Sequence, residues 1–213
     1  MKCILMSCMN IDQDHVKGEV SKIIKPNMKV VCIPFASDLQ WLLNGNKNEY
    51  FKRHYTPFSK FGIKRYNFYI AKIQDDYKFL KKKIRNADIV YFSGGYMENI
   101  MYHLRNKYMI RFLRLLKNDK IFIGESAGAL VLEDKYIEVP HIEDHYKSFK
   151  KEEGISIVDN VEVIVHYDPN NEKHRENLEA VKTMTKKPVY ALTDSAMIIV
   201  DNNKTLILGE TYN

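Results

Sequence analysis

Residues 121–129 read Ile-Phe-Ile-Gly-Glu-Ser-Ala-Gly-Ala and carry the clearest fold signal of the chain. An apolar run leads into the pattern Gly-x-Ser-x-Gly at residues 124–128. This pattern is typical of a sharp turn from a buried strand into a helix that presents the serine hydroxyl above a sheet. The glycines tolerate a crowded backbone, and the helix directs amide groups towards developing negative charge. Ser126 is therefore the candidate nucleophile, the alternative being an ordinary turn in which it caps the helix.

Short apolar runs before this turn predict further buried strands of a parallel sheet. They lie at residues 3–6, 30–35, 66–70 and 89–92. Between these strands, apolar residues recur at helical spacing over residues 75–86 and 97–117. The alternation predicts an α/β fold in which a mostly parallel central sheet is flanked by helices on both faces.

The pattern after Ser126 is less regular. Apolar runs at 161–165 and 189–192 predict strands, and residues 172–185 predict a helix. Two last runs, 196–200 and 205–208, are joined by Asp-Asn-Asn-Lys and predict a C-terminal β-hairpin at a sheet edge.

The length and composition indicate one globular domain over residues 1–213. Hydrophobic residues make up 45% of the chain and charged residues 28%, as in soluble proteins. Cys3, Cys8 and Cys32 form no C-x-x-C pair and are expected to be reduced thiols. The sequence shows no apolar run of the roughly 20 residues that a membrane span needs, and the first apolar run is too short for a secretory signal. A cytoplasmic location with no membrane partner is expected.

The net charge of +6 raises the question of an acidic partner. The densest basic run, Lys81-Lys82-Lys83 with Arg85, lies in a predicted amphipathic helix and is better explained as a solvated face. We therefore expect no nucleic-acid partner. The alternative is a nucleic-acid-binding protein, whose affinity would fall steeply with salt and survive Ser126→Ala.

A serine nucleophile needs a base, and the base needs an acid that orients it. His166 follows the apolar run 161–165, and Asp194 follows the run that starts at Val189. Both positions are strand ends, where catalytic side chains often lie, although each residue taken singly is also compatible with a structural role. The order Ser, His, Asp differs from the α/β-hydrolase order, in which the acid precedes the histidine. The other histidines fit less well: His15, His54, His103, His141, His145 and His174.

An oxyanion site needs two amide donors near the nucleophile. The Ala127 amide directly follows Ser126, and a second donor could come from Ser93-Gly94-Gly95, which ends the strand 89–92. A plain tight turn at the double glycine is an equal alternative.

With these motifs, the chain resembles the peptidase E family of serine peptidases. These are aspartyl dipeptidases related to cyanophycinases, with a fold similar to class I glutamine amidotransferases. The resemblance covers about residues 88 to 200. Its anchors are Phe92-Ser93-Gly94-Gly95 with Asn99 and Leu104, residues 124–129, His166-Tyr167, and Leu192-Thr193-Asp194.

The resemblance implies roles for particular residues. Ser126 would be the nucleophile, His166 its base and Asp194 the third member, with Gly95 and Ala127 as the oxyanion donors. The implied substrate is a small peptide, and no metal or organic cofactor is implied. A preference for N-terminal aspartate would call for a cation. Arg175 is the candidate for that substrate-binding role, the alternative being an ordinary helix-surface arginine.

Two further alternatives concern this same fold. A non-catalytic member could bind a small ligand or a partner protein. A glutamine amidotransferase is disfavoured because that chemistry uses a cysteine nucleophile, whereas residue 126 is serine. Either a monomer or a homodimer is compatible with the sequence.

Overall fold

A large, mostly parallel β-sheet forms the centre of the computed structural model, which describes residues 2–37, 47–139, 149–202 and 204–213. Its strands are β1 (Lys2–Met6), β2 (Val30–Ile33), β3 (Phe68–Ile70), β4 (Ile89–Phe92), β5 (Ile121–Glu125), β10 (Met197–Asp201) and β11 (Lys204–Leu208). They are ordered β11-β10-β1-β5-β4-β2-β3. The strands β1, β5, β4, β2 and β3 run parallel to one another, whereas β10 is antiparallel to both of its neighbours, β1 and β11. The predicted parallel sheet and C-terminal hairpin are confirmed. Asn203, part of the predicted connection, lies outside the described residues.

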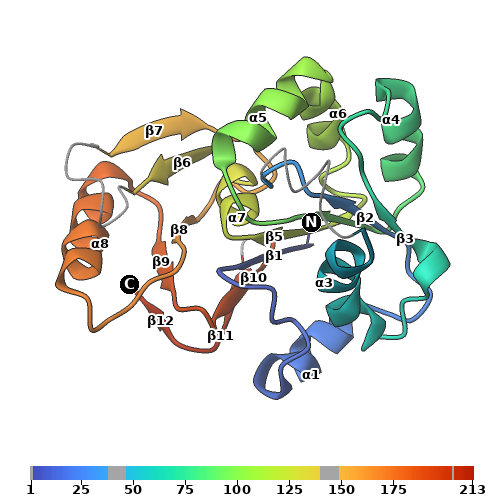
Figure 1. Cartoon of the computed structure of the whole chain (residues 1–213). Helices are drawn as coiled ribbons and strands as arrows, with labels where there is room; N and C mark the ends of the chain where they lie inside the picture. Colours follow the sequence, from blue (N-terminus) through green and yellow to red (C-terminus); the bar gives the residue numbers. More distant parts are fainter. Residues whose placement is uncertain (1, 38–46, 140–148, 203) are drawn as a thin grey trace.

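Helices cover both faces of this sheet (Figure 1). Because successive side chains of a strand point to opposite faces, Leu5 joins one apolar cluster and Ile4 the other. Helices α1 (Asp14–Ile23) and α3 (Lys47–Ser59) contribute Val16 and Phe58 to the Ile4 cluster. The Leu5 cluster receives side chains from α4 (Tyr77–Arg85), α5 (Met97–Asn106), α6 (Met109–Leu115) and α7 (Ala127–Val131).

The single helix predicted over residues 97–117 is wrong, because the structure divides it into α5 and α6. Tyr108 adopts a left-handed conformation with φ 51°, which interrupts the helical hydrogen-bond pattern. Ile100 and Leu104 of the predicted apolar stripe are buried, whereas Tyr108 is 79% exposed and Leu115 73% exposed. Phe112 of the same stripe is buried again in α6, so the interruption at Tyr108 exposes Tyr108 and Leu115 only.

Two smaller sheets lie beside the main one, at the left of Figure 1. A three-stranded sheet has the order β12-β9-β8. It packs against helix α8 through an apolar cluster that includes Leu178 and Val181. The elements of this part are β6 (Lys135–Glu138), β7 (Lys150–Glu153), β8 (Glu162–Ile164), α8 (Glu172–Met184), β9 (Val189–Leu192) and β12 (Thr211–Tyr212). The short 3-10 helix η1 (Arg65–Asn67) precedes β3.

The described helices include none that is long and apolar enough to cross a bilayer.

Candidate active site

Ser126 lies on the turn between β5 and α7, where the backbone is strained. Its φ of 52° and ψ of −121° are unusual for a residue with a side chain. Neighbouring glycines make the turn possible, because a Cβ on Gly124 would lie 2.6 Å from Ala129 Cα and one on Gly128 would lie 2.2 Å from the Phe92 carbonyl oxygen. The Ser126 amide donates to the Met6 carbonyl at 2.8 Å. This strand-to-helix turn has the form that the sequence predicts.

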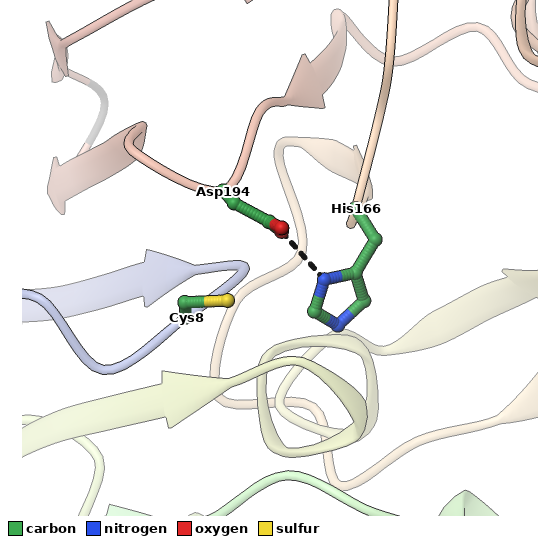
Figure 2. Close-up of side chains that lie close together, drawn as sticks. All are labelled: Cys8, His166 and Asp194. Carbon is green, nitrogen blue, oxygen red and sulfur yellow. Dashed lines mark hydrogen bonds and ion pairs between the residues drawn. The ribbon is translucent and has the colours of Figure 1, made fainter. Parts of the chain in front are cut away.

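The three predicted triad residues meet in space, although they come from two different sheets. Ser126 follows a strand of the main sheet, whereas His166 follows β8 and Asp194 follows β9 of the smaller sheet. Ser126 Oγ lies 2.8 Å from His166 Nε2. His166 Nδ1 lies 2.7 Å from Asp194 Oδ1, the contact drawn in Figure 2. A carboxylate can only accept, so Nδ1 carries a proton and, in the neutral imidazole, Nε2 is left to accept the serine proton.

Residues just after β1 contact both His166 and Asp194. The Ser7 hydroxyl accepts from the His166 amide at 2.9 Å and donates to the Leu192 carbonyl at 2.9 Å. Asn10 Nδ2 donates to the Asp194 carbonyl at 2.7 Å. Sequence reasoning missed these residues. The available signal is their position just after a central strand, because the carboxyl ends of parallel strands meet at one edge of a sheet.

The Asp194 carboxyl also has Cys8 as a neighbour, whose sulfur faces it in Figure 2. Partial burial acts to raise the Asp194 pKa, but hydrogen bonds from His166 and Cys8 outweigh it, and the pKa lies below its usual value. Burial, followed by the charge of Asp194, raises the pKa of the Cys8 thiol to about 11. The thiol is therefore a hydrogen-bond donor at neutral pH and a poor nucleophile.

Cys8, His166 and Asp194 are also the group in the described chain that could hold a metal ion. Their ligand atoms lie within 4.8 Å of one another, and thiolate, imidazole and carboxylate are all zinc ligands. The same Nδ1 and carboxylate atoms already share a hydrogen bond that leads to Ser126. We therefore interpret the group as part of a proton-transfer chain.

The predicted oxyanion donors, Gly95 and Ala127, lie in the wall of the pocket that contains Ser126. Within the described residues, neither backbone amide donates to another group of the protein. Gly95 has φ 136°, and a Cβ there would lie 2.3 Å from the Ala36 carbonyl oxygen. A Cβ on Gly94 would lie 3.0 Å from Ser126 Cβ. Both glycines are thus needed for β4 to approach the turn closely.

A pocket of about 520 Å³ opens beside Ser126. This is within the range of about 300–1,000 Å³ typical of ligand sites. Its wall is mostly aliphatic, formed by Met97, Leu130, Ile137, Val139 and residues 163–165. The described lining residues include one acidic residue, Glu138, and no lysine or arginine. The chemistry of this wall limits which side chains can bind next to the nucleophile.

Arg175 lies outside the described wall of this pocket. Its Nη1 donates to the Pro169 carbonyl at 2.6 Å on the exposed side of α8. His174 and Asn177 of the same helix line the pocket instead. A helix turns 100° per residue, so residues 175 and 177 face nearly opposite directions. The spacing of His174 and Asn177 with the buried Leu178 was the signal that could have identified this face.

The floor beneath the turn is polar and buried. Glu125 is 8% exposed and accepts a hydrogen bond from the Tyr91 hydroxyl. Tyr91 also lies 3.5 Å from His54 Nδ1. Burial and then the nearby Arg53 lower the pKa of His54 to about 4, so this ring is neutral at physiological pH. His54 contacts the Tyr91 hydroxyl, whereas the ring that contacts Ser126 Oγ is that of His166. His141 and His145 lie outside the described residues.

The mixed α/β fold, with Ser126 on a strained turn against His166 and Asp194, is characteristic of the serine hydrolase class. The particular family follows from sequence comparison, because the model of peptidase family S51 matches residues 4–208. The chain belongs to this family. Membership supports peptidase activity, while a comparison with curated proteins gives no significant match.

Solved structures share the fold. A candidate peptidase E protein from Listeria monocytogenes EGD-e superposes with a TM-score of 0.70 at 17% identity, covering 97% of this chain and 96% of that one. A peptidase from an acI-B1 Actinobacterium gives a TM-score of 0.61 at 14% identity, covering 98% of this chain and 87% of that one. The predicted class I glutamine amidotransferase-like fold and the peptidase E resemblance are thus confirmed.

Proposed function

We propose that this protein is a serine peptidase that hydrolyses short peptides through an acyl-enzyme on Ser126. The observation that carries the proposal is the continuous hydrogen-bonded chain from Ser126 Oγ through His166 to Asp194, with contacts of 2.8 and 2.7 Å. Family membership supports the peptide-bond chemistry. The serine mechanism rests on the geometry of the three side chains.

In the proposed mechanism each group has one task. His166 Nε2 takes the proton of Ser126 as Oγ attacks the peptide carbonyl, and Asp194 stabilises the imidazolium that forms. The amides of Gly95 and Ala127 would donate to the developing oxyanion, each contributing about 3 kcal/mol to the barrier reduction. His166 then protonates the leaving amine. Water activated by the same base hydrolyses the acyl-enzyme.

A preference for an N-terminal aspartate has less support than the catalytic mechanism. It requires a cation next to the bound carboxylate, and Arg175 donates instead to the Pro169 carbonyl on the exposed side of its helix. The substrate-binding role of Arg175 stays a prediction. An Arg175→Gln variant tests this role. If Arg175 recognises the substrate, its loss should lower kcat/KM for acidic peptides selectively.

The cytoplasmic location also stays a prediction. It fits Cys3, Cys8 and Cys32, all of which are free thiols.

A fluorophosphonate probe tests the nucleophile directly. We expect one covalent adduct per chain on the wild type, detected by intact mass, and none on folded Ser126→Ala. Ser195→Ala is the matched control, because Ser195 is an exposed serine next to Asp194. Labelling should persist in EDTA, since no metal takes part in the proposed mechanism. An unlabelled wild type would favour the non-catalytic binding member of this fold.

A further inference from the structure

The pocket beside Ser126 is lined mainly by aliphatic side chains, as expected for a site that binds an uncharged side chain. Val163 and Leu130 are 1% and 7% exposed, and they form its inner part together with Ile164. The oxyanion amides of Gly95 and Ala127 lie in the same wall. A peptide whose carbonyl oxygen reaches those amides therefore places its adjacent side chain against aliphatic groups.

The charges around the pocket oppose an acidic side chain. Glu138 is the acidic residue of the described wall. Lys150 lies opposite it on the neighbouring strand β7, but Lys150 is exposed and is not part of the described wall. His174 Nδ1 accepts a hydrogen bond from the Asp168 amide at 2.8 Å, which only the neutral imidazole can do. An unpaired carboxylate in such surroundings is strongly disfavoured.

One polar group of the wall has no protein partner. Asn177 is 2% exposed, and its Nδ2 is buried without a hydrogen bond in the described structure. Asn177 lines the same pocket. Because buried polar groups in native proteins are nearly always paired, this carboxamide points to a ligand that supplies the missing acceptor. A neutral amide pairs well with the carbonyl of a peptide backbone.

We propose that the pocket binds an uncharged aliphatic side chain of a short peptide, on the acyl side of the scissile bond, while Asn177 donates to a further carbonyl oxygen or, in a dipeptide, to the C-terminal carboxylate. The inference rests on the proposed serine peptidase and departs from the aspartyl specificity that the peptidase E resemblance implies. Asn177 then serves as a specificity-determining residue on the face of α8 that Arg175 does not share.

Matched dipeptides test the side-chain preference. Leu-Leu, Met-Leu, Asn-Leu and Asp-Leu are compared as substrates and as ligands that slow fluorophosphonate labelling of wild-type Ser126. We expect kcat/KM for Leu-Leu and for Met-Leu to exceed that for Asp-Leu at least about tenfold, the usual scale for apolar pockets. Asn-Leu separates charge from shape and should fall between them. An Asp-Leu value equal to or above that of Leu-Leu would overturn the inference.

The labelling reaction keeps the two proposals distinguishable. Fluorophosphonate reacts with an activated serine whatever side chain the natural substrate carries. A protein that is not labelled fails as a serine peptidase. A protein that is labelled but prefers Asp-Leu fails only the side-chain assignment.

Two variants test the residues of the wall. Asn177→Leu should raise KM for Leu-Leu about tenfold while Tm stays equal or rises, because the substitution removes an unpaired buried amide. Asn118→Leu, at an exposed position, is the control. An unchanged KM, or a KM increase accompanied by a lower Tm, would show that Asn177 is structural.

Glu138→Gln tests the charge argument. We expect the ratio of kcat/KM for Asp-Leu to that for Leu-Leu to rise about fivefold in this variant, whereas Glu179→Gln, at an exposed position, should leave the ratio unchanged. Equal ratios in both variants would count against the charge argument.

Discussion

The seven-stranded sheet and the three-stranded sheet differ in what they contribute to the site. The inner strands of the larger sheet are buried on both faces, and β5 leads into the strained turn with Ser126. The smaller one carries His166 and Asp194 at the ends of β8 and β9. A reactive turn is thus a local property of one sheet, whereas a working triad depends on how the two sheets are joined.

Two buried carboxyl groups connect β8 of the smaller sheet to the segment after α7 and to β6. Glu133 Oε1 accepts from the Val163 amide of β8 at 3.3 Å, and Glu162 Oε1 accepts from the Ile137 amide of β6 at 3.0 Å. Both side chains are fully buried, and the second oxygen of each has no partner within the described chain. Burial, followed by the neighbouring Glu162, raises the pKa of Glu133 well above its usual value. The region around β8 therefore contains buried polar groups, and ionisation of Glu133 is expected to affect its stability.

Removing the base gives the largest expected effect. His166→Ala should lower kcat for peptide hydrolysis about 10⁶-fold, since loss of a triad base removes nearly all of the triad's contribution. Steady-state kinetics measure the loss, and circular dichroism checks the fold. His15→Ala, at an exposed histidine, is the control. Activity within tenfold of wild type would mean that another group serves as the base.

The acid is expected to matter less than the base. Asp194→Asn should lower kcat about 10⁴-fold, because an amide can donate to Nδ1 and favour the wrong tautomer. The pH-independent kcat measures this loss. Asp201→Asn, outside the site, should retain normal kcat, and an Asp194→Asn enzyme with normal kcat would remove Asp194 from the triad.

A break in the contact between the sheets should have an intermediate effect. Ser7→Ala removes the acceptor for the His166 amide and the donor to Leu192, so we expect kcat to fall about tenfold, the scale of one or two hydrogen bonds. Fluorophosphonate labelling should slow in parallel. Ser21→Ala on the exposed face of α1 is the control. Unchanged kcat in Ser7→Ala would show that β1 does not position the base.

The smallest effect concerns stability and pH. Because the Glu133 pKa is raised in the folded state, its contribution favours folding below the ordinary pKa of 4.5 and is lost as pH rises through the folded-state value. Glu133→Gln keeps an acceptor but cannot ionise. Urea unfolding should show it more stable than wild type by at least about 1 kcal/mol at pH 8, the scale of a buried polar group left without a partner, and little changed at pH 4. An equal decline with pH in both proteins would contradict the assignment.

The larger sheet could be predicted from sequence because its strands are continuous apolar runs separated by helices. The same signal could not show that the runs at 161–165 and 189–192 belong to a different sheet, since an apolar run does not identify its partner. The three residues of the proposed triad could be selected from sequence because each follows a strand, and the structure brings their side chains together. Ser7 and Asn10 were missed because their role depends on contacts with Leu192 and Asp194, far away in sequence.

The side of α8 that lines the pocket shows a different limit of prediction from sequence. Arg175 was selected for its charge, whereas helical periodicity places His174 and Asn177 with the buried Leu178. The break between α5 and α6 has no such signal, because a left-handed tyrosine leaves the apolar spacing before it unchanged. The single-domain assignment over residues 1–213 stays a prediction.

The pairing of β1 has a consequence for how the enzyme is made. Lys2 lies opposite Asp201 and Met6 opposite Met197, so one edge of β1 stays open until the ribosome has produced β10. The turn with Ser126 can form earlier, because β1, β4 and β5 are already available. His166 and Asp194 emerge later and dock onto residues next to β1. A nascent chain therefore contains the proposed nucleophile before the proposed base and acid, and the proposed triad stays incomplete for most of the synthesis of the chain.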